Sequence, residues 1–117
     1  MDFENSGADT NISGSWHGVG RDKTLNNSND NELTVTLETL TATEVAGSIT
    51  CVRSGETCYT KTFSGTVEQS GEYLYSTATY DQTDIFYPQI RFTYDSVQDM
   101  IYNIDISPVT KLARVTE

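Results

Sequence analysis

Apolar or small residues alternate with polar ones along most of the chain, and this period of two constrains the fold more than any other feature. In the segment Glu32–Thr41, for example, Leu33, Val35 and Leu37 fall on one face of an extended strand. The pattern returns about every 12 residues, with turn-forming stretches between the repeats. A helical period is hard to find, so the sequence predicts an all-β protein with eight strands. We expect the strands at Ile12–Gly20, Glu32–Thr41, Val45–Cys51, Tyr59–Val67, Glu72–Tyr80, Phe86–Asp95, Met100–Ser107 and Lys111–Glu117.

Antiparallel strands that follow one another along the chain can close into an up-and-down barrel. Closure pairs the last strand with the first and removes the edges that an open sheet of this length would have to protect. We therefore predict a single eight-stranded antiparallel up-and-down β-barrel over residues 12–117, with residues 1–11 as a flexible leader. A β-sandwich of the same strands is the alternative.

The charge of the chain excludes some functions. The 117 residues include 17 Asp and Glu against 7 Lys and Arg, a formal net charge of −10. A field of this sign repels polyanions, so we expect no nucleic-acid binding through phosphate neutralisation. No apolar run approaches the roughly 20 residues of a membrane-spanning helix. The same charge would suit an acidic inhibitor or immunity-type module that docks on a basic protein partner.

Two cysteines flank a predicted turn at Ser54-Gly55. In a two-residue hairpin centred on that turn, Cys51 and Cys58 lie opposite each other and within disulfide range. This pairing puts Ile49 and Phe63 on opposite faces, so either a bulge follows Cys58 or the disulfide prediction fails. We expect the disulfide, with two unpaired thiols as the alternative. A disulfide implies an oxidising compartment, so we expect a secreted, periplasmic or cell-surface protein.

The tripeptide Gly14-Ser15-Trp16 lies on the first predicted strand, and Arg114 lies on the last. This arrangement resembles that of the lipocalin-type (calycin) barrels, in which a Gly-x-Trp packs at the closed end beneath an Arg or Lys of the last strand. The resemblance implies a structural role for Gly14, Trp16 and Arg114, with the guanidinium stacked on the indole plug. In length the chain is closer to avidin-like or minimal bacterial barrels. A single Trp is too few for the avidin-type aromatic box around biotin.

Aromatic side chains are concentrated in the late strands. Alternation places Phe92, Tyr94, Tyr102 and Ile104 on the inward faces, where they either fill the barrel or line a partly open cup. In an open cup, the hydroxyls of Tyr94 and Tyr102 would be available to a small ligand. We therefore expect a non-enzymatic protein of the bacterial cell envelope that binds a small apolar or aromatic ligand at these residues. The acidic protein-docking module is the alternative.

Motifs of the common enzyme and metal classes are not found. His17 is the single histidine, and by alternation it points away from the face of Trp16, so we expect a surface residue and not a general base. The cysteines and His17 lack zinc spacing. The oxygen-rich segment Asn26–Glu32 does not match the EF-hand spacing, and we expect a solvated loop. The sequence therefore predicts no enzyme, no cofactor and no metal site.

Overall fold

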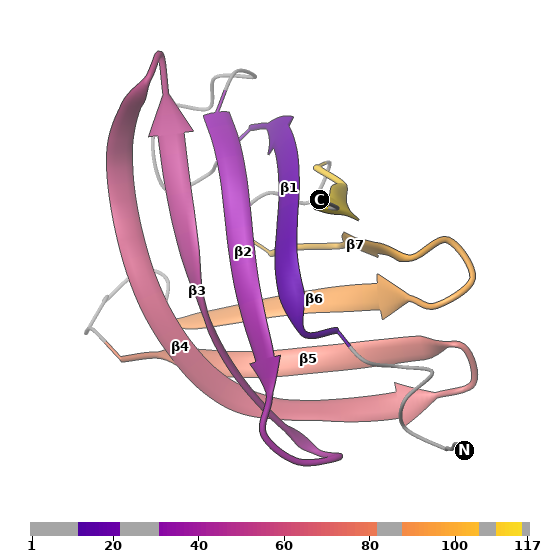
Figure 1. The fold of residues 1–117 in the computed structure, drawn as a ribbon. Helices are drawn as coiled ribbons and strands as arrows, with labels where there is room; N and C mark the ends of the chain where they lie inside the picture. The colour runs from indigo at the N-terminus through magenta and orange to yellow at the C-terminus, as the bar shows by residue number, and fades with distance from the viewer. Residues whose placement is uncertain (1–11, 22–30, 82–87, 106–109, 116–117) are drawn as a thin grey trace.

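The computed structural model describes residues 12–21, 31–81, 88–105 and 110–115 of the chain. Eight antiparallel strands form a closed barrel in chain order, with the first strand paired to the last (Figure 1). The predicted all-β, eight-stranded barrel is therefore confirmed. No helix in this described part of the chain is long and apolar enough to cross a membrane. The strands are β1 (Gly14–Gly20), β2 (Asn31–Thr39), β3 (Glu44–Arg53), β4 (Glu56–Ser70), β5 (Tyr73–Tyr80), β6 (Gln89–Asp95), β7 (Met100–Tyr102) and β8 (Leu112–Arg114).

The longest strand, β4, bends and so belongs to two groups of strands. Its first part pairs with β3 and its second part with β5, and the two pairings overlap between Phe63 and Thr66. In Figure 1, β1–β3 run from top to bottom, β5–β7 run across the view, and β4 curves from one direction to the other. A Cβ at Gly65, within the overlap, would collide with the carbonyl oxygen of Thr77 on β5. Glycine at this position therefore allows the close approach of β4 and β5 at the bend.

Every second residue of the strands faces the barrel interior. In β2, Leu33, Val35 and Leu37 are buried, whereas the residues between them are more exposed. Directly opposite residues in a ladder share a face, so Ile49 and Cys51 of β3 lie inside the barrel as well. The core is thus formed by the alternation that the sequence shows.

Barrel closure depends on contact between the short β8 and β1. Arg114 of β8 lies opposite Trp16 of β1. A Cβ at Gly18 would collide with the carbonyl oxygen of Lys111, which precedes β8. Glycine at position 18 therefore lets the end of the chain come close enough to β1 to close the barrel.

The hairpin between β3 and β4 turns where the sequence predicted. Ser54 and Gly55 have positive φ angles of 54° and 82°. Left-handed conformations at both central residues are typical of the type I′ turn, which matches the twist of the flanking strands.

The predicted disulfide is wrong, because no disulfide joins Cys51 to Cys58. Val52 pairs with Thr57 beside the turn, but the next pair inward joins Cys51 to Tyr59. Cys58 is therefore the extra residue of a β-bulge. It is exposed, whereas Cys51 is buried on the inner face.

The bulge also resolves the conflict between Ile49 and Phe63, both of which are buried. Beyond the bulge, the residues of β4 at odd-numbered positions share the inner face with Ile49 and Cys51. Because no disulfide joins the two cysteines, the argument for an oxidising compartment no longer applies.

Several predictions lie outside the described residues. They concern the leader at residues 1–11, residues 26–30 of the oxygen-rich segment, the start of the predicted strand Phe86–Asp95, and the ends of the two last predicted strands.

Candidate functional site

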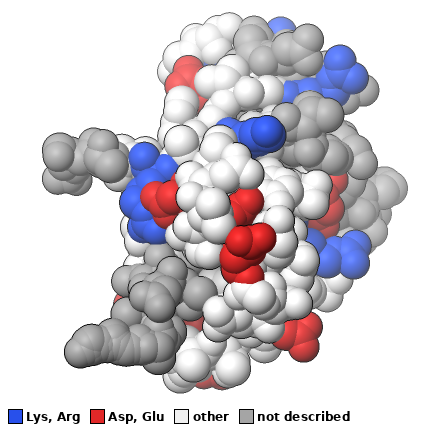
Figure 2. Space-filling view, turned by 90° about the vertical axis from the view of Figure 1, so that its right-hand side faces the viewer, with Lys and Arg blue, Asp and Glu red and all other residues white. Residues whose placement is uncertain are grey.

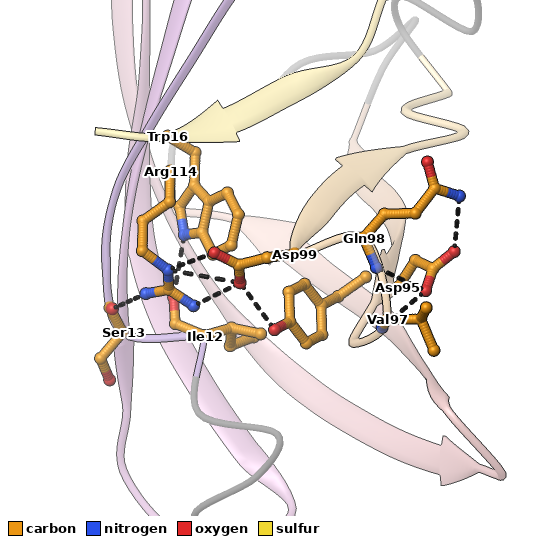
Figure 3. A network of polar contacts seen from close by, with 9 residues as sticks. Ile12, Ser13, Trp16, Asp95, Val97, Gln98, Asp99 and Arg114 are labelled. Carbon is orange, nitrogen blue, oxygen red and sulfur yellow. Dashed lines mark hydrogen bonds and ion pairs between the residues drawn. The ribbon is translucent and has the colours of Figure 1, made fainter. Parts of the chain in front are cut away.

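The inner face of β1 carries one large side chain, Trp16, among glycines. Trp16 is fully buried, and its indole Nε1 donates a hydrogen bond to the backbone oxygen of Ile12 at 3.0 Å (Figure 3). Its ring meets the ring of Tyr94 on β6 edge to face, with 5.6 Å between the centroids. The indole thereby joins the first strand to β6 across the barrel interior.

Arg114 of β8 covers the indole. Its guanidinium carbon lies 4.3 Å from the centroid of the Trp16 ring. Nη1 donates to the backbone oxygen of Ser13 at 2.9 Å, and Nε and Nη2 donate to the two carboxylate oxygens of Asp99 at 3.0 Å (Figure 3). Gly14 has φ +128°, a conformation that side-chain-bearing residues rarely adopt. The Gly-x-Trp on β1 and the Arg on β8 are therefore in contact through one stacked guanidinium.

Asp99 lies in the turn between β6 and β7, and this turn is held by a second carboxylate. Asp95 Oδ1 accepts hydrogen bonds from the backbone N–H groups of Val97 at 2.9 Å and Gln98 at 3.3 Å. Asp99 has a left-handed φ of 54°, and its Oδ1 accepts a hydrogen bond from the hydroxyl of Tyr94 at 2.8 Å. We refer to Trp16, Tyr94, Asp99 and Arg114 as the Trp16 end of the barrel.

The charges at the Trp16 end stabilise one another. Burial raises the pKa of Tyr94 to about 12, and its hydrogen bond to Asp99 acts in the same direction. Hydrogen bonds from Arg114 hold the pKa of Asp99 below its ordinary value, and the bond to Asp99 raises the pKa of Arg114. Near neutral pH the phenol is thus neutral, the carboxylate ionised and the guanidinium charged. This arrangement favours a structural role in which the groups hold β1, β8 and the β6–β7 turn together.

The inner face near the β3–β4 hairpin is built differently. The bulge at Cys58 turns Tyr59 and Lys61 of β4 inward, opposite the buried Cys51 and Ile49. The ammonium of Lys61 lies 5.3 Å from the ring centroid of Tyr59 and 5.0 Å from that of Tyr80 on β5. We refer to Tyr59, Lys61 and Tyr80 as the Lys61 end.

The four predicted ligand residues do not share one environment. Phe92, Tyr94 and Ile104 are buried, but the hydroxyl of Tyr94 is already bonded within the Trp16 end. Tyr102 is half-buried and lies on the outer face, because its neighbour Ile101 is the residue that faces inward opposite Tyr94. The prediction of an inward-facing Tyr102 is therefore wrong. Asn103 has φ 55°, and this left-handed residue interrupts the alternation before Ile104.

Sequence reasoning missed three polar residues that face the interior or its ends. Asp99 could have been suspected as a partner of Arg114, because it is a carboxylate in the short segment between two predicted strands. Lys61 shares the alternation of Tyr59 and Phe63, but its place opposite Ile49 depends on the bulge. Ser76 is buried on the inner face of β5, a strand whose two faces both carry aromatic and small residues in the sequence.

The outer surface carries mixed charges. His17 lies on the outer face of β1, where its Nε2 is 3.3 Å from Oε1 of Glu32, and Arg91 and Asp105 form a second exposed pair at 3.7 Å. On the face shown in Figure 2, Asp and Glu occupy several places, some of them beside Lys or Arg. Among the described residues, no group of three or more His, Cys, Asp or Glu could hold a metal ion.

Comparison with known proteins adds no relative: no family model, curated protein or solved structure matches this chain.

Proposed function

We propose that the barrel is a non-enzymatic binding protein that takes a small apolar or aromatic molecule into its lumen. The observation that carries this proposal is the hydroxyl of Ser76. It lies on the inner face of β5 in a residue only 2% exposed, and it has no hydrogen-bond partner among the described residues. An unsatisfied buried hydroxyl costs about 1–3 kcal/mol. A bound molecule that hydrogen-bonds to it would remove this cost.

The surroundings of Ser76 define the chemistry of the ligand. Its ladder partners are Val67 on β4 and Phe92 on β6, and both are buried. A ligand at this level would therefore contact apolar side chains over most of its surface and would need one group able to bond with the hydroxyl. Binding sites for small molecules commonly combine an apolar lining with a few polar groups in this way.

The two ends of the barrel suggest the direction of access. The Trp16 end is closed by the indole and by the hydrogen bonds of Arg114 to Asp99 and Ser13. At the Lys61 end, the flexible lysine chain lies over the rings of Tyr59 and Tyr80, and a flexible side chain can move aside more readily than a stacked guanidinium. We therefore expect the ligand to pass by Lys61, and the lipocalin resemblance of Gly14, Trp16 and Arg114 is in line with this use of the lumen. The acidic docking module has no comparable observation in its favour.

The experiment uses N-phenyl-1-naphthylamine, a neutral aromatic probe, in place of the natural ligand. Trp16 is the single tryptophan of the chain and is buried inside the barrel, so energy transfer from its indole to the probe reports binding in the lumen. We expect saturable binding with quenching of the Trp16 emission. Ser76→Leu should abolish both signals by removing the hydroxyl and placing a larger side chain beside Phe92, while the matched outward substitution on the same strand, Thr79→Leu, should leave them unchanged.

Failure of the probe to bind to the folded wild-type protein would contradict the proposal. Equal binding by wild type and a folded Ser76→Leu variant, judged folded by its circular dichroism, would contradict it as well.

A further inference from the structure

Three tyrosines lie together on the outside of the barrel. Tyr73 and Tyr75 are two residues apart on β5, with ring centroids 6.2 Å apart and planes tilted by 33°. Tyr102 on β7 lies on the same outer face, two strands away from Tyr75. Thr93 of β6 pairs with both Tyr75 and Tyr102 and is only 7% exposed although it faces outward, in keeping with cover by the neighbouring side chains. We call Tyr73, Tyr75 and Tyr102 the tyrosine strip.

The strip is not required by the barrel itself. The outer faces of β2, β3 and the first part of β4 carry mainly Thr, Ser and acidic side chains and no aromatic residue. Single exposed apolar residues are common on protein surfaces, but three rings grouped on β5 and β7 are a feature that calls for a function. Tyr75 keeps 46% of its surface exposed within this row.

A hollow lies at each end of the strip. The larger has a volume of about 560 Å³, within the range of small-molecule sites, and Tyr75 forms part of its wall. The smaller, about 170 Å³, is lined by Gln98, Met100, Tyr102 and Lys111. The side chains of the larger hollow that can form hydrogen bonds are Thr43, Thr66, Glu68, Gln69, Tyr75 and Thr77.

The lining of the larger hollow selects the class of ligand. It offers three threonine hydroxyls, one amide and one carboxylate beside the exposed phenol ring. These groups match a molecule that has many hydroxyls and also an apolar face, because hydroxyls can donate to the carboxylate and accept from the amide and the threonines. A phosphate would instead meet the negative charge of Glu68, and an apolar molecule would leave most of these polar groups without partners. A sugar ring has both required properties, since its C–H face can pack on a tyrosine ring.

We propose that the tyrosine strip and its two flanking hollows form a binding site for a neutral oligosaccharide, separate from the lumen. One sugar unit would occupy the hollow of Glu68 and Gln69 and stack on Tyr75. Following units would lie along Tyr73 toward Tyr102 and the second hollow. Three rings, with one hollow beside Tyr75 and another beside Tyr102, favour a ligand of several units over a single small molecule.

The site is tested with four neutral hexasaccharides: those of cellulose, starch amylose, chitin and β-1,3-glucan. We expect calorimetry to detect binding of at least one of them by the full chain. Tyr75→Ala should weaken this binding at least about tenfold, whereas Tyr75→Phe, which keeps the ring, should weaken it only slightly. Thr36→Ala, on the outer face of β2, serves as the matched control and should have no effect. The affinity should also stay constant between about 0.05 and 0.5 M NaCl, because a neutral ligand makes no ion pairs.

Two outcomes would overturn the proposal: binding of none of the four hexasaccharides, or binding that a folded Tyr75→Ala variant retains in full. Affinity that falls steeply with salt would do the same, because it would indicate a charged partner. Saturating hexasaccharide should leave the binding of N-phenyl-1-naphthylamine unchanged, so that this site and the proposed lumen site can fail independently.

Discussion

The Trp16 end is built around the planar guanidinium of Arg114, and the Lys61 end around the flexible ammonium chain of Lys61. At the Trp16 end, Arg114 makes hydrogen bonds of 2.9–3.0 Å to Ser13 and Asp99 and stacks on the indole, and Asp99 receives a further bond from Tyr94. At the Lys61 end, the ammonium lies 5.0 and 5.3 Å from two phenol ring centroids.

Directional contacts from several segments fix one arrangement, whereas contacts between a flexible ammonium and ring faces permit several. Hydrogen bonds weaken steeply away from their preferred geometry, and cation–π contacts tolerate a range of positions. The comparison therefore assigns stability chiefly to the Trp16 end and adaptability to the Lys61 end. Substitutions at the two ends should differ in their effect on the free energy of unfolding.

Trp16→Ala should cause the largest loss. Removing a fully buried indole leaves a cavity and removes its contacts with the Tyr94 ring and the Arg114 guanidinium. We therefore expect the free energy of unfolding to fall by about 3–5 kcal/mol. The measurement is urea unfolding followed by circular dichroism, since the variant has no tryptophan fluorescence. A loss below about 1 kcal/mol would show that the indole is not the plug of this end.

Asp99→Asn should have the next largest effect, because it replaces the charged partner of Arg114 by a neutral one of the same shape. The side chain of Asp99 is 47% exposed, and we therefore expect a loss of only about 1 kcal/mol at neutral pH. Glu38→Gln, an exposed carboxylate on β2, is the control and should change stability very little.

The effect of Asp99→Asn should also depend on pH in a defined direction. Arg114 lowers the pKa of Asp99 in the folded state from the ordinary value of 3.8, so its contribution is present above that value. The contribution is lost as the pH falls through the lowered folded pKa. The unfolding midpoints of wild type and variant should therefore converge in acid. A difference that is independent of pH would mean that the carboxylate charge does not contribute.

The features that the sequence predicts correctly are those that follow from local alternation and from closure. Leu33, Val35 and Leu37 face inward because a period of two is a property of any strand with one buried face. Trp16 and Arg114 lie opposite each other because an up-and-down barrel makes neighbours of its first and last strands. The first conclusion needs only the local alternation, and the second needs only the strand count and the order of the strands.

The features that could not be predicted depend on single irregular residues. Each of these residues switches the residues after it between the inner and the outer face of the barrel. The bulge at Cys58 turns Lys61 inward and separates the two thiols, and the left-handed Asn103 separates the faces of Tyr102 and Ile104. A shift of one residue exchanges the two faces of a strand, and tertiary packing decides whether it occurs. Both faces of β5 also carry aromatic and small residues, so the sequence does not decide whether Ser76 faces inward.

Tyr94→Phe should have a smaller effect than Asp99→Asn, because it removes one hydrogen bond to Asp99 and keeps the ring contact with Trp16. We expect a loss of about 0.5–1 kcal/mol at neutral pH. The sign of its pH dependence is opposite to that of Asp99. The pKa of Tyr94 is raised to about 12 in the folded state, so the unfolded chain releases this proton first, and stability is lost as the pH rises from about 10 through 12.

Urea midpoints of wild type and Tyr94→Phe, measured near neutral pH and at about pH 11, test this expectation. The wild type should lose more stability than the variant over this interval. Tyr75→Phe, on the outer face, is the matched control and should follow the wild type. An alkaline loss that is equal in all three proteins would contradict a buried, hydrogen-bonded Tyr94.

Lys61→Gln should have the smallest effect of the series. It removes the ammonium from the faces of Tyr59 and Tyr80, and contacts of this kind contribute about 0.5–1 kcal/mol where water has access. The variant recovers part of this loss, because the neutral glutamine side chain avoids the cost of desolvating the lysine ammonium. We therefore expect a net loss of less than about 0.5 kcal/mol in urea unfolding, below that of either Asp99→Asn or Tyr94→Phe. A double-mutant cycle with Tyr80→Leu isolates the ring contact itself. If Lys61→Gln costs as much as Asp99→Asn, the ring contacts fix the Lys61 end as firmly as hydrogen bonds fix the Trp16 end, and access to the lumen would have to be sought elsewhere on the barrel.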